Sequence, residues 1–100
     1  MTFVNVGTLG VLPGKRDELV AILTRRSQVL ADIGCQLYEV GINEAEPDAV
    51  FVVELWESED AHTASLQLDS VRAAISEAMP LLSGKMGGLR FRVVGSPLRD

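Results

Sequence analysis

Residues 49–60 read AVFVVELWESED, and this stretch decides the fold class. Its first part, residues 50–57, predicts a strand with two apolar faces, because hydrophobic residues occupy both sets of alternating positions. One face carries Phe51, Val53 and Leu55, and the other carries Val50, Val52 and Trp56. Ser58 can then cap a helix, and Glu59 and Asp60 suit its first turn because the helix dipole favours acidic side chains there.

The segments on either side of this stretch add three strands. Residues 3–12 form the first strand, which is also apolar on both faces and ends at a Pro-Gly turn. Residues 35–43 form the second strand, and residues 89–94 form the last one. We expect the intervening residues 83–88 to be flexible, because they are rich in glycine.

Two helical regions separate these strands. Hydrophobic residues follow a 3.6-residue spacing through residues 15–33, and Gly34 supplies a stop. The second region begins after Ser58 and runs to Leu82, with a pause at Asp69-Ser70, which can cap a second helical segment.

The order βαββαβ predicts one α+β domain over residues 1–100, with a ferredoxin-like fold and a four-stranded, mostly antiparallel sheet. Two helices can cover only one face of such a sheet. The other face would expose a larger apolar patch than soluble monomers tolerate. We therefore expect a homodimer that forms through the sheet face, around a two-fold axis.

Composition excludes several classes of partner. Hydrophobic residues make up 47% of the 100 residues, but their longest unbroken runs are four or five residues, such as residues 49–53, which is too short to span a bilayer. The net charge is −5, with 9 Lys and Arg against 14 Asp and Glu, so a nucleic-acid or anionic-membrane partner is not expected. Cys35 is the only cysteine and the N-terminus lacks a signal-peptide pattern, so we expect a cytoplasmic protein.

Three motifs together resemble the antibiotic biosynthesis monooxygenase superfamily, and most of all its quinol-monooxygenase branch. They are residues 12–15 (LPGK), residues 34–38 (GCQLY) and the strand-ending Trp56-x-Ser58 with its acidic helix start. The resemblance implies a dimeric α+β barrel with a pocket between sheet and helices in each subunit. It also implies oxidation of an electron-rich aromatic or quinol substrate by O2, without a metal, flavin or other cofactor.

The chain departs from that resemblance at four positions. Ser65 and Ser70 stand where many relatives carry histidine, nine and about fourteen residues after the tryptophan. Ile75 and Gly7 stand where the haem-degrading branch needs histidine and asparagine, so haem oxygenation is disfavoured. A non-catalytic dimer that binds a ligand or a partner therefore stays open as the alternative function.

Five residues are candidates for the site, and each has a structural alternative. His62 is the only imidazole and suits proton transfer near neutral pH, or it is a partly exposed helix residue. Trp56 could stack on a flat substrate or fill the core, and Asn5 could orient a substrate oxygen or make a cross-strand contact. Tyr38 could donate to a phenol or quinone oxygen or to the protein, and Ser65 could line the pocket.

The remaining polar residues favour structural roles. We expect Arg90 and Arg92 to pair with Glu54 or Glu57, across the sheet or across the dimer, rather than to bind an anion. Cys35 has no basic neighbour in the sequence, which favours an inert thiol. The carboxylates form no spaced set of metal ligands. The leading hypothesis is a cofactor-independent monooxygenase with His62, Trp56 and Asn5 in the catalytic site and Tyr38 and Ser65 at the substrate.

Overall fold

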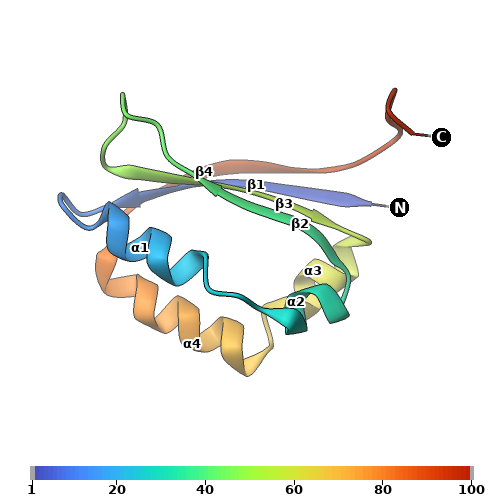
Figure 1. The fold of residues 1–100 in the computed structure, drawn as a ribbon, viewed down its shortest axis with the longest axis horizontal. Coiled ribbons are helices and arrows are strands. Elements are labelled where there is room, and N and C mark those ends of the chain that lie inside the picture. The colour runs from blue at the N-terminus through green and yellow to red at the C-terminus, as the bar shows by residue number, and fades with distance from the viewer. Residues whose placement is uncertain (1, 100) are drawn as a thin grey trace.

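A computed structural model describes residues 2–99, which form one antiparallel sheet with all its helices on one face (Figure 1). Along the chain the elements are β1 (Phe3–Val11), α1 (Arg16–Leu23), α2 (Gln28–Asp32), β2 (Cys35–Gly41), β3 (Ala49–Trp56), α3 (Glu59–Ser65), α4 (Asp69–Ala78), the 3-10 turn η1 (Met79–Leu81) and β4 (Leu82–Arg92). The strand order is β2-β3-β1-β4. The ferredoxin-like α+β fold is thereby confirmed, with each helical region divided in two.

The single helix expected over residues 15–33 is wrong. The α1 helix ends where the Thr24 hydroxyl donates to the Val20 carbonyl at 2.7 Å, a local hydrogen bond that competes with helix propagation. A new helix, α2, begins after Ser27, whose hydroxyl accepts from the Leu30 amide at 3.4 Å. Residues 24–27 therefore form a non-helical linker between α1 and α2.

The second helical region divides as expected, but only one of its two expected caps is present. The Ser58 hydroxyl accepts from the Ala61 amide at 3.0 Å and begins α3, which confirms that cap. The pause after Ser65 is also present. The cap at Asp69-Ser70 is wrong, because Leu68 precedes α4 in an extended conformation and no side-chain hydrogen bond closes that end.

The expectation that residues 83–88 are flexible is also wrong. They belong to β4, which begins at Leu82 and pairs antiparallel with β1, with Gly88 opposite Gly7. The φ of Gly88 is +138°, and a Cβ at this position would lie 2.0 Å from the Val6 carbonyl oxygen. Glycine there is a requirement of close strand pairing rather than a sign of a loop.

The two faces of the sheet are both apolar, as expected. On the helix side, a core forms around Val11, Leu19, Val50 and Leu81. Alternation and register place a second set of side chains on the face without helices, which we call the outer face: Val4, Val6, Phe51, Val53, Leu55, Leu89 and Phe91. In the described part of the chain, no helix has the length and apolar character needed to cross a membrane.

Candidate functional site

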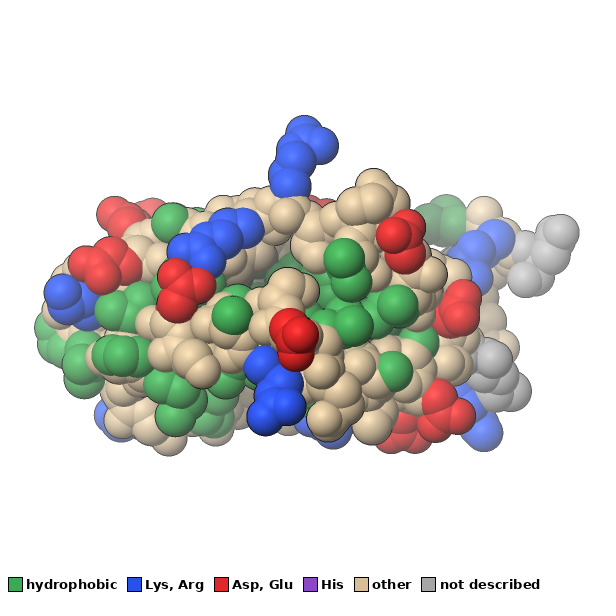
Figure 2. Space-filling model, turned by 90° about the horizontal axis from the view of Figure 1, so that it is seen from below, with side chains coloured by type: hydrophobic (Ala, Val, Ile, Leu, Met, Phe, Trp, Pro, Cys, Tyr) green, Lys and Arg blue, Asp and Glu red, His purple; other side chains and the backbone are tan. Residues whose placement is uncertain are grey.

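A large cavity lies between the helix-side face of the sheet and the helices. Its volume is about 1180 Å³, which is ample for a small polycyclic molecule. Figure 2, which views the molecule from the helix side, shows apolar side chains around a hollow. The wall includes Leu19, Leu23, Leu30, Ala74, Ile75, Met79 and Met86, and the sheet floor includes Asn5, Gly7, Val52, Glu54 and Trp56.

Glu54 is the centre of a polar cluster on this floor. Its carboxylate accepts from Asn5 Nδ2 through Oε2 at 2.6 Å and from Trp56 Nε1 through Oε1 at 3.0 Å. His62 Nε2 lies 3.9 Å from the same Oε1. Glu54 is 7% exposed and His62 is 5% exposed, so this charge lies in a water-poor setting where electrostatic interactions are strong.

His62 lies on helix α3 and packs against this part of the sheet. Its ring is tilted against Phe3 and meets Trp56 edge-on, with centroids 5.6 and 5.5 Å away. The histidine is therefore buried between aromatic rings and is not the partly exposed helix residue of the alternative. Burial lowers the pKa of His62 below its usual 6.5, the neighbouring Glu54 opposes that change, and Arg90 reinforces it. The imidazole is thus neutral at pH 7 and can accept a proton.

Asn5 links the cluster to the last strand. Its Oδ1 accepts from Arg90 Nε at 3.3 Å, while its Nδ2 donates to Glu54. Within residues 2–99, neither Arg90 nor Arg92 forms an ion pair with Glu54 or Glu57, so the pairing expected across the sheet of one chain is wrong. The same pairing across a dimer stays a prediction. Arg90 reaches the asparagine instead because the strand register places these two residues directly opposite each other.

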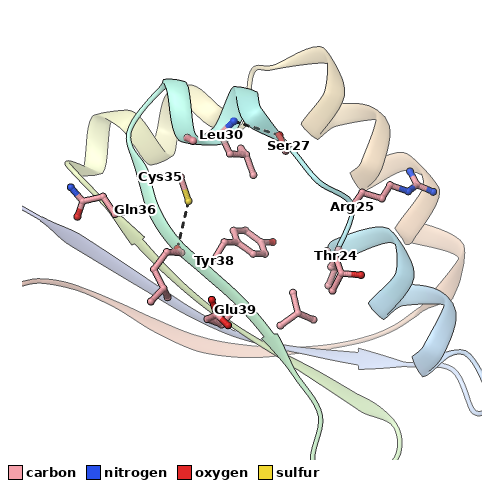
Figure 3. A pocket seen from close by; sticks show the side chains of 12 residues that line it. Thr24, Arg25, Ser27, Leu30, Cys35, Gln36, Tyr38 and Glu39 are labelled. Carbon is pink, nitrogen blue, oxygen red and sulfur yellow. Dashed lines mark hydrogen bonds between the residues drawn. The ribbon is translucent and has the colours of Figure 1, made fainter.

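Ser65 and Tyr38 lie on different sides of the cavity. The Ser65 hydroxyl donates to the His62 carbonyl at 2.6 Å, so it is engaged in the last turn of α3 although its residue lines the cavity. Tyr38 projects from β2 into the space below the 24–27 linker (Figure 3). Burial, reinforced by Glu54 and Cys35, raises the pKa of Tyr38 to about 12, so the phenol stays protonated and can donate.

A second hollow of about 440 Å³ lies beside Tyr38, between β2 and the 24–27 linker. Cys35 lines it, and burial raises the pKa of its thiol, which fits the expected inert role. Arg25 lies on the rim of both hollows and forms a two-pronged ion pair with Glu77 of α4 at 2.5 and 2.9 Å. That pair joins the linker to α4 at the cavity's edge.

No group of three or more His, Cys, Asp or Glu side chains is arranged to hold a metal ion within residues 2–99. The cavity floor offers instead one carboxylate, one neutral imidazole, an amide and an indole. These groups can hold a hydroxylated ring, accept its proton and donate to an oxygen atom.

Comparison with known proteins agrees with this architecture. The family model for antibiotic biosynthesis monooxygenase matches residues 2–77. The chain belongs to the antibiotic biosynthesis monooxygenase family. No curated protein matches it in sequence.

Solved structures of family candidates superpose closely on the chain. A candidate antibiotic biosynthesis monooxygenase from Chloroflexus aurantiacus is 33% identical, with 96% of each chain covered and a TM-score of 0.83. One from Caulobacter crescentus is 25% identical, with 94% of this chain and 91% of that chain covered and a TM-score of 0.78. One from Nitrosomonas europaea shares only the fold, with 8% identity, 93% and 90% coverage and a TM-score of 0.83.

The five residues predicted for the site all line the cavity, and the structure brings Asn5, Trp56 and His62 together around Glu54. Tyr38 and Ser65 line the same cavity. The Ser65 hydroxyl reaches the cluster only through the His62 carbonyl, and within residues 2–99 no side-chain hydrogen bond joins Tyr38 to the cluster. Glu54 was not predicted as a site residue. Its signal was available, because a single carboxylate shares an otherwise apolar strand face with Trp56, two residues away.

Proposed function

We propose that this antibiotic biosynthesis monooxygenase family member is a homodimeric, cofactor-independent monooxygenase that oxidises a small aromatic or quinol-type substrate with O2. One observation supports this most: an apolar cavity of about 1180 Å³ has its polar groups gathered on one part of the floor, at Asn5, Glu54, Trp56 and His62. Such a site binds a flat ring through apolar contacts and orients it through hydrogen bonds to a few polar atoms.

The chemistry needs the substrate to supply the electrons. For an anthrone, the ring CH2 group and O2 become a carbonyl group and water, so one oxygen atom enters the substrate and the other leaves as water. His62 accepts the proton that leaves the substrate, and Asn5 holds the substrate oxygen. Trp56 and Tyr38 position the ring, while Ser65 shapes the cavity wall.

The dimer forms through the outer face in this proposal. Three of its side chains are well exposed in the single chain, namely Val53 at 37%, Phe91 at 47% and Leu89 at 58%. A second copy of the same face would bury them around a two-fold axis. A cytoplasmic location suits the unpaired thiol of Cys35.

Oxygen uptake tests the activity. Tag-free protein is mixed with a panel of hydroquinones and anthrones, and O2 consumption is followed with an electrode. We expect turnover above the uncatalysed rate for at least one ring system, and its loss in Trp56→Ala. Rates equal to the uncatalysed reaction across the panel would count against catalysis.

A non-catalytic ligand-binding dimer of the same fold is the second candidate. It is favoured by Ser65, where many relatives carry histidine, because the serine hydroxyl is engaged with the His62 carbonyl and offers no acid or base. Trp56 is the only tryptophan, so its fluorescence reports ligand binding directly. Quenching by apolar ring compounds without O2 consumption would support this second function.

A further inference from the structure

The buried carboxylate of Glu54 faces the buried imidazole of His62 across the cavity floor. Strand β3 supplies the first group and helix α3 the second, and Glu54 Oε1 lies 3.9 Å from His62 Nε2. We propose that Glu54 and His62 form a carboxylate–imidazole dyad in which His62 takes the substrate proton and Glu54 is the positioning residue that stabilises the imidazolium. This inference rests on the proposed function and deepens it.

The position of the Glu54 carboxylate is fixed by two donors. Asn5 Nδ2 holds Oε2, and Trp56 Nε1 holds Oε1, so the negative charge is preorganised on the floor before any ligand enters. Arg90 holds the other end of the Asn5 amide and so fixes which way that amide points. Asn5 and Trp56 therefore orient the buried carboxylate directly, and Arg90 orients it through Asn5.

Three charged side chains act on His62, from three elements. Glu54 on β3 and Glu59 on α3 raise its pKa, and Arg90 on β4 lowers it. Glu59 is exposed and screened by water, whereas Glu54 is buried beside the ring. Two unit charges about 4 Å apart attract each other several times more strongly in such a water-poor site than in bulk water. Glu54 is therefore the group that can hold a protonated His62 in this site.

The proton-transfer step balances without any further reagent. The O–H bond of a ring hydroxyl breaks, an N–H bond forms on the imidazole, and the electron pair stays on the substrate oxygen. The aryloxide produced is the electron-rich species that O2 oxidises in the proposed reaction. Because Glu54 already places one negative charge beside the ring, the dyad favours an uncharged phenol, hydroquinone or enol over a carboxylic acid.

Nuclear magnetic resonance tests the dyad without any substrate. His62 is the only histidine, so its imidazole signals in tag-free protein need no further assignment. We expect Glu54→Gln to lower the His62 titration midpoint by about one pH unit or more, a tenfold or greater loss of proton affinity. The matched control is Glu59→Gln, which removes the exposed charge and should change that affinity less than about threefold. Equal effects of the two variants, or a raised midpoint in Glu54→Gln, would overturn the dyad.

A second variant covers the case in which Glu54→Gln does not fold. Glu54→Asp keeps the charge but withdraws it by one methylene, so the His62 midpoint should fall below that of the unmodified protein, by less than about one pH unit. A midpoint unchanged or raised in Glu54→Asp would then decide against the dyad.

If a substrate is found by oxygen uptake, the acid limb of kcat/KM should move to lower pH in Glu54→Gln by the same amount as the His62 midpoint. An unmoved limb would overturn the dyad while leaving the monooxygenase activity intact. A dyad that passes the resonance test in a protein with no turnover would instead reject the proposed function alone.

Discussion

The two faces of the sheet come from the same strands and use the same alternation, yet they treat polar groups in opposite ways. In β3, Val53 points to the outer face and its neighbour Glu54 points to the cavity. On the cavity side, Glu54 is 7% exposed and its carboxylate has two N–H donors. On the outer face, valine, leucine and phenylalanine predominate, and several of them are well exposed.

The apolar side chains on the two faces therefore have different meanings. Apolar side chains on the cavity side are already covered by helices, so the few polar groups there are costly to bury and indicate chemistry. Apolar side chains on the outer face have no helix above them, so they indicate a protein partner. Each face can be tested on its own terms.

The largest effect is expected from removing the ring that anchors the cavity side. Trp56 is 1% exposed, and Trp56→Ala should lower the free energy of unfolding by about 3–5 kcal/mol because a large core side chain leaves a cavity behind. Urea denaturation followed by circular dichroism measures this loss. Trp56→Phe, which keeps a ring but removes the N–H donated to Glu54, should be clearly milder; equal losses would mean that the hydrogen bond matters more than packing.

The outer face should be sensitive to charge rather than to volume. Val53→Glu places a carboxylate in the middle of the proposed dimer interface, opposite Glu39 in the strand register. Dimer affinity should fall about 100-fold or more, since an unpaired charge would be buried between subunits. Sedimentation velocity measures it, with Ser76→Glu on exposed α4 as the control for charge alone. Unmodified protein that is already monomeric at micromolar concentration would refute the dimer.

Much of the fold could be predicted because hydrophobic periodicity carries it. The two apolar faces of β3 and the Ser58 cap depend on residues close together in sequence, and both predictions were confirmed. Residues 83–88 were misinterpreted because their glycines resemble a flexible segment, whereas pairing with β1 makes glycine necessary at residue 88. Because β1 and β4 are far apart in the sequence, their pairing leaves no pattern within residues 83–88 that would predict it.

The site was predictable to a similar extent. Trp56 and His62 were identified by residue type, and the structure brings them into edge-on contact. The role of Glu54 depends on Asn5, 49 residues away, and on the register that sets these two residues opposite each other. A carboxylate on an apolar strand face was visible in the sequence, but its partners were not.

A pH dependence should distinguish the cavity side from the rest of the molecule. Burial lowers the pKa of His62 in the folded chain, so between its ordinary value of 6.5 and that lower value the unfolded chain binds more protons. The His62 contribution to stability is therefore complete above pH 6.5 and is lost as the pH falls through the lowered pKa. Urea unfolding at several pH values measures the slope, and His62→Gln should flatten it. A slope unchanged by this substitution would mean that the imidazole titrates alike in both states.

The smallest effect is expected at Tyr38, and it sharpens the contrast within the cavity itself. Glu54 and Asn5 have protein partners, whereas no hydrogen bond of the Tyr38 hydroxyl is found among the described residues, although its ring is half-buried beneath the 24–27 linker. Tyr38→Phe should therefore change the free energy of unfolding by less than about 0.5 kcal/mol, as for a polar group without a partner. Affinity for a ring that carries a hydroxyl or quinone oxygen should fall about three- to tenfold, the worth of one hydrogen bond, while affinity for the same ring without that oxygen should not change. Titration of Trp56 fluorescence with both ligands measures this difference. A loss of stability comparable to that of a buried hydrogen bond would show that the Tyr38 hydroxyl has a structural partner. The free hydrogen-bond donor for a ligand would then have to be another residue of the cavity wall.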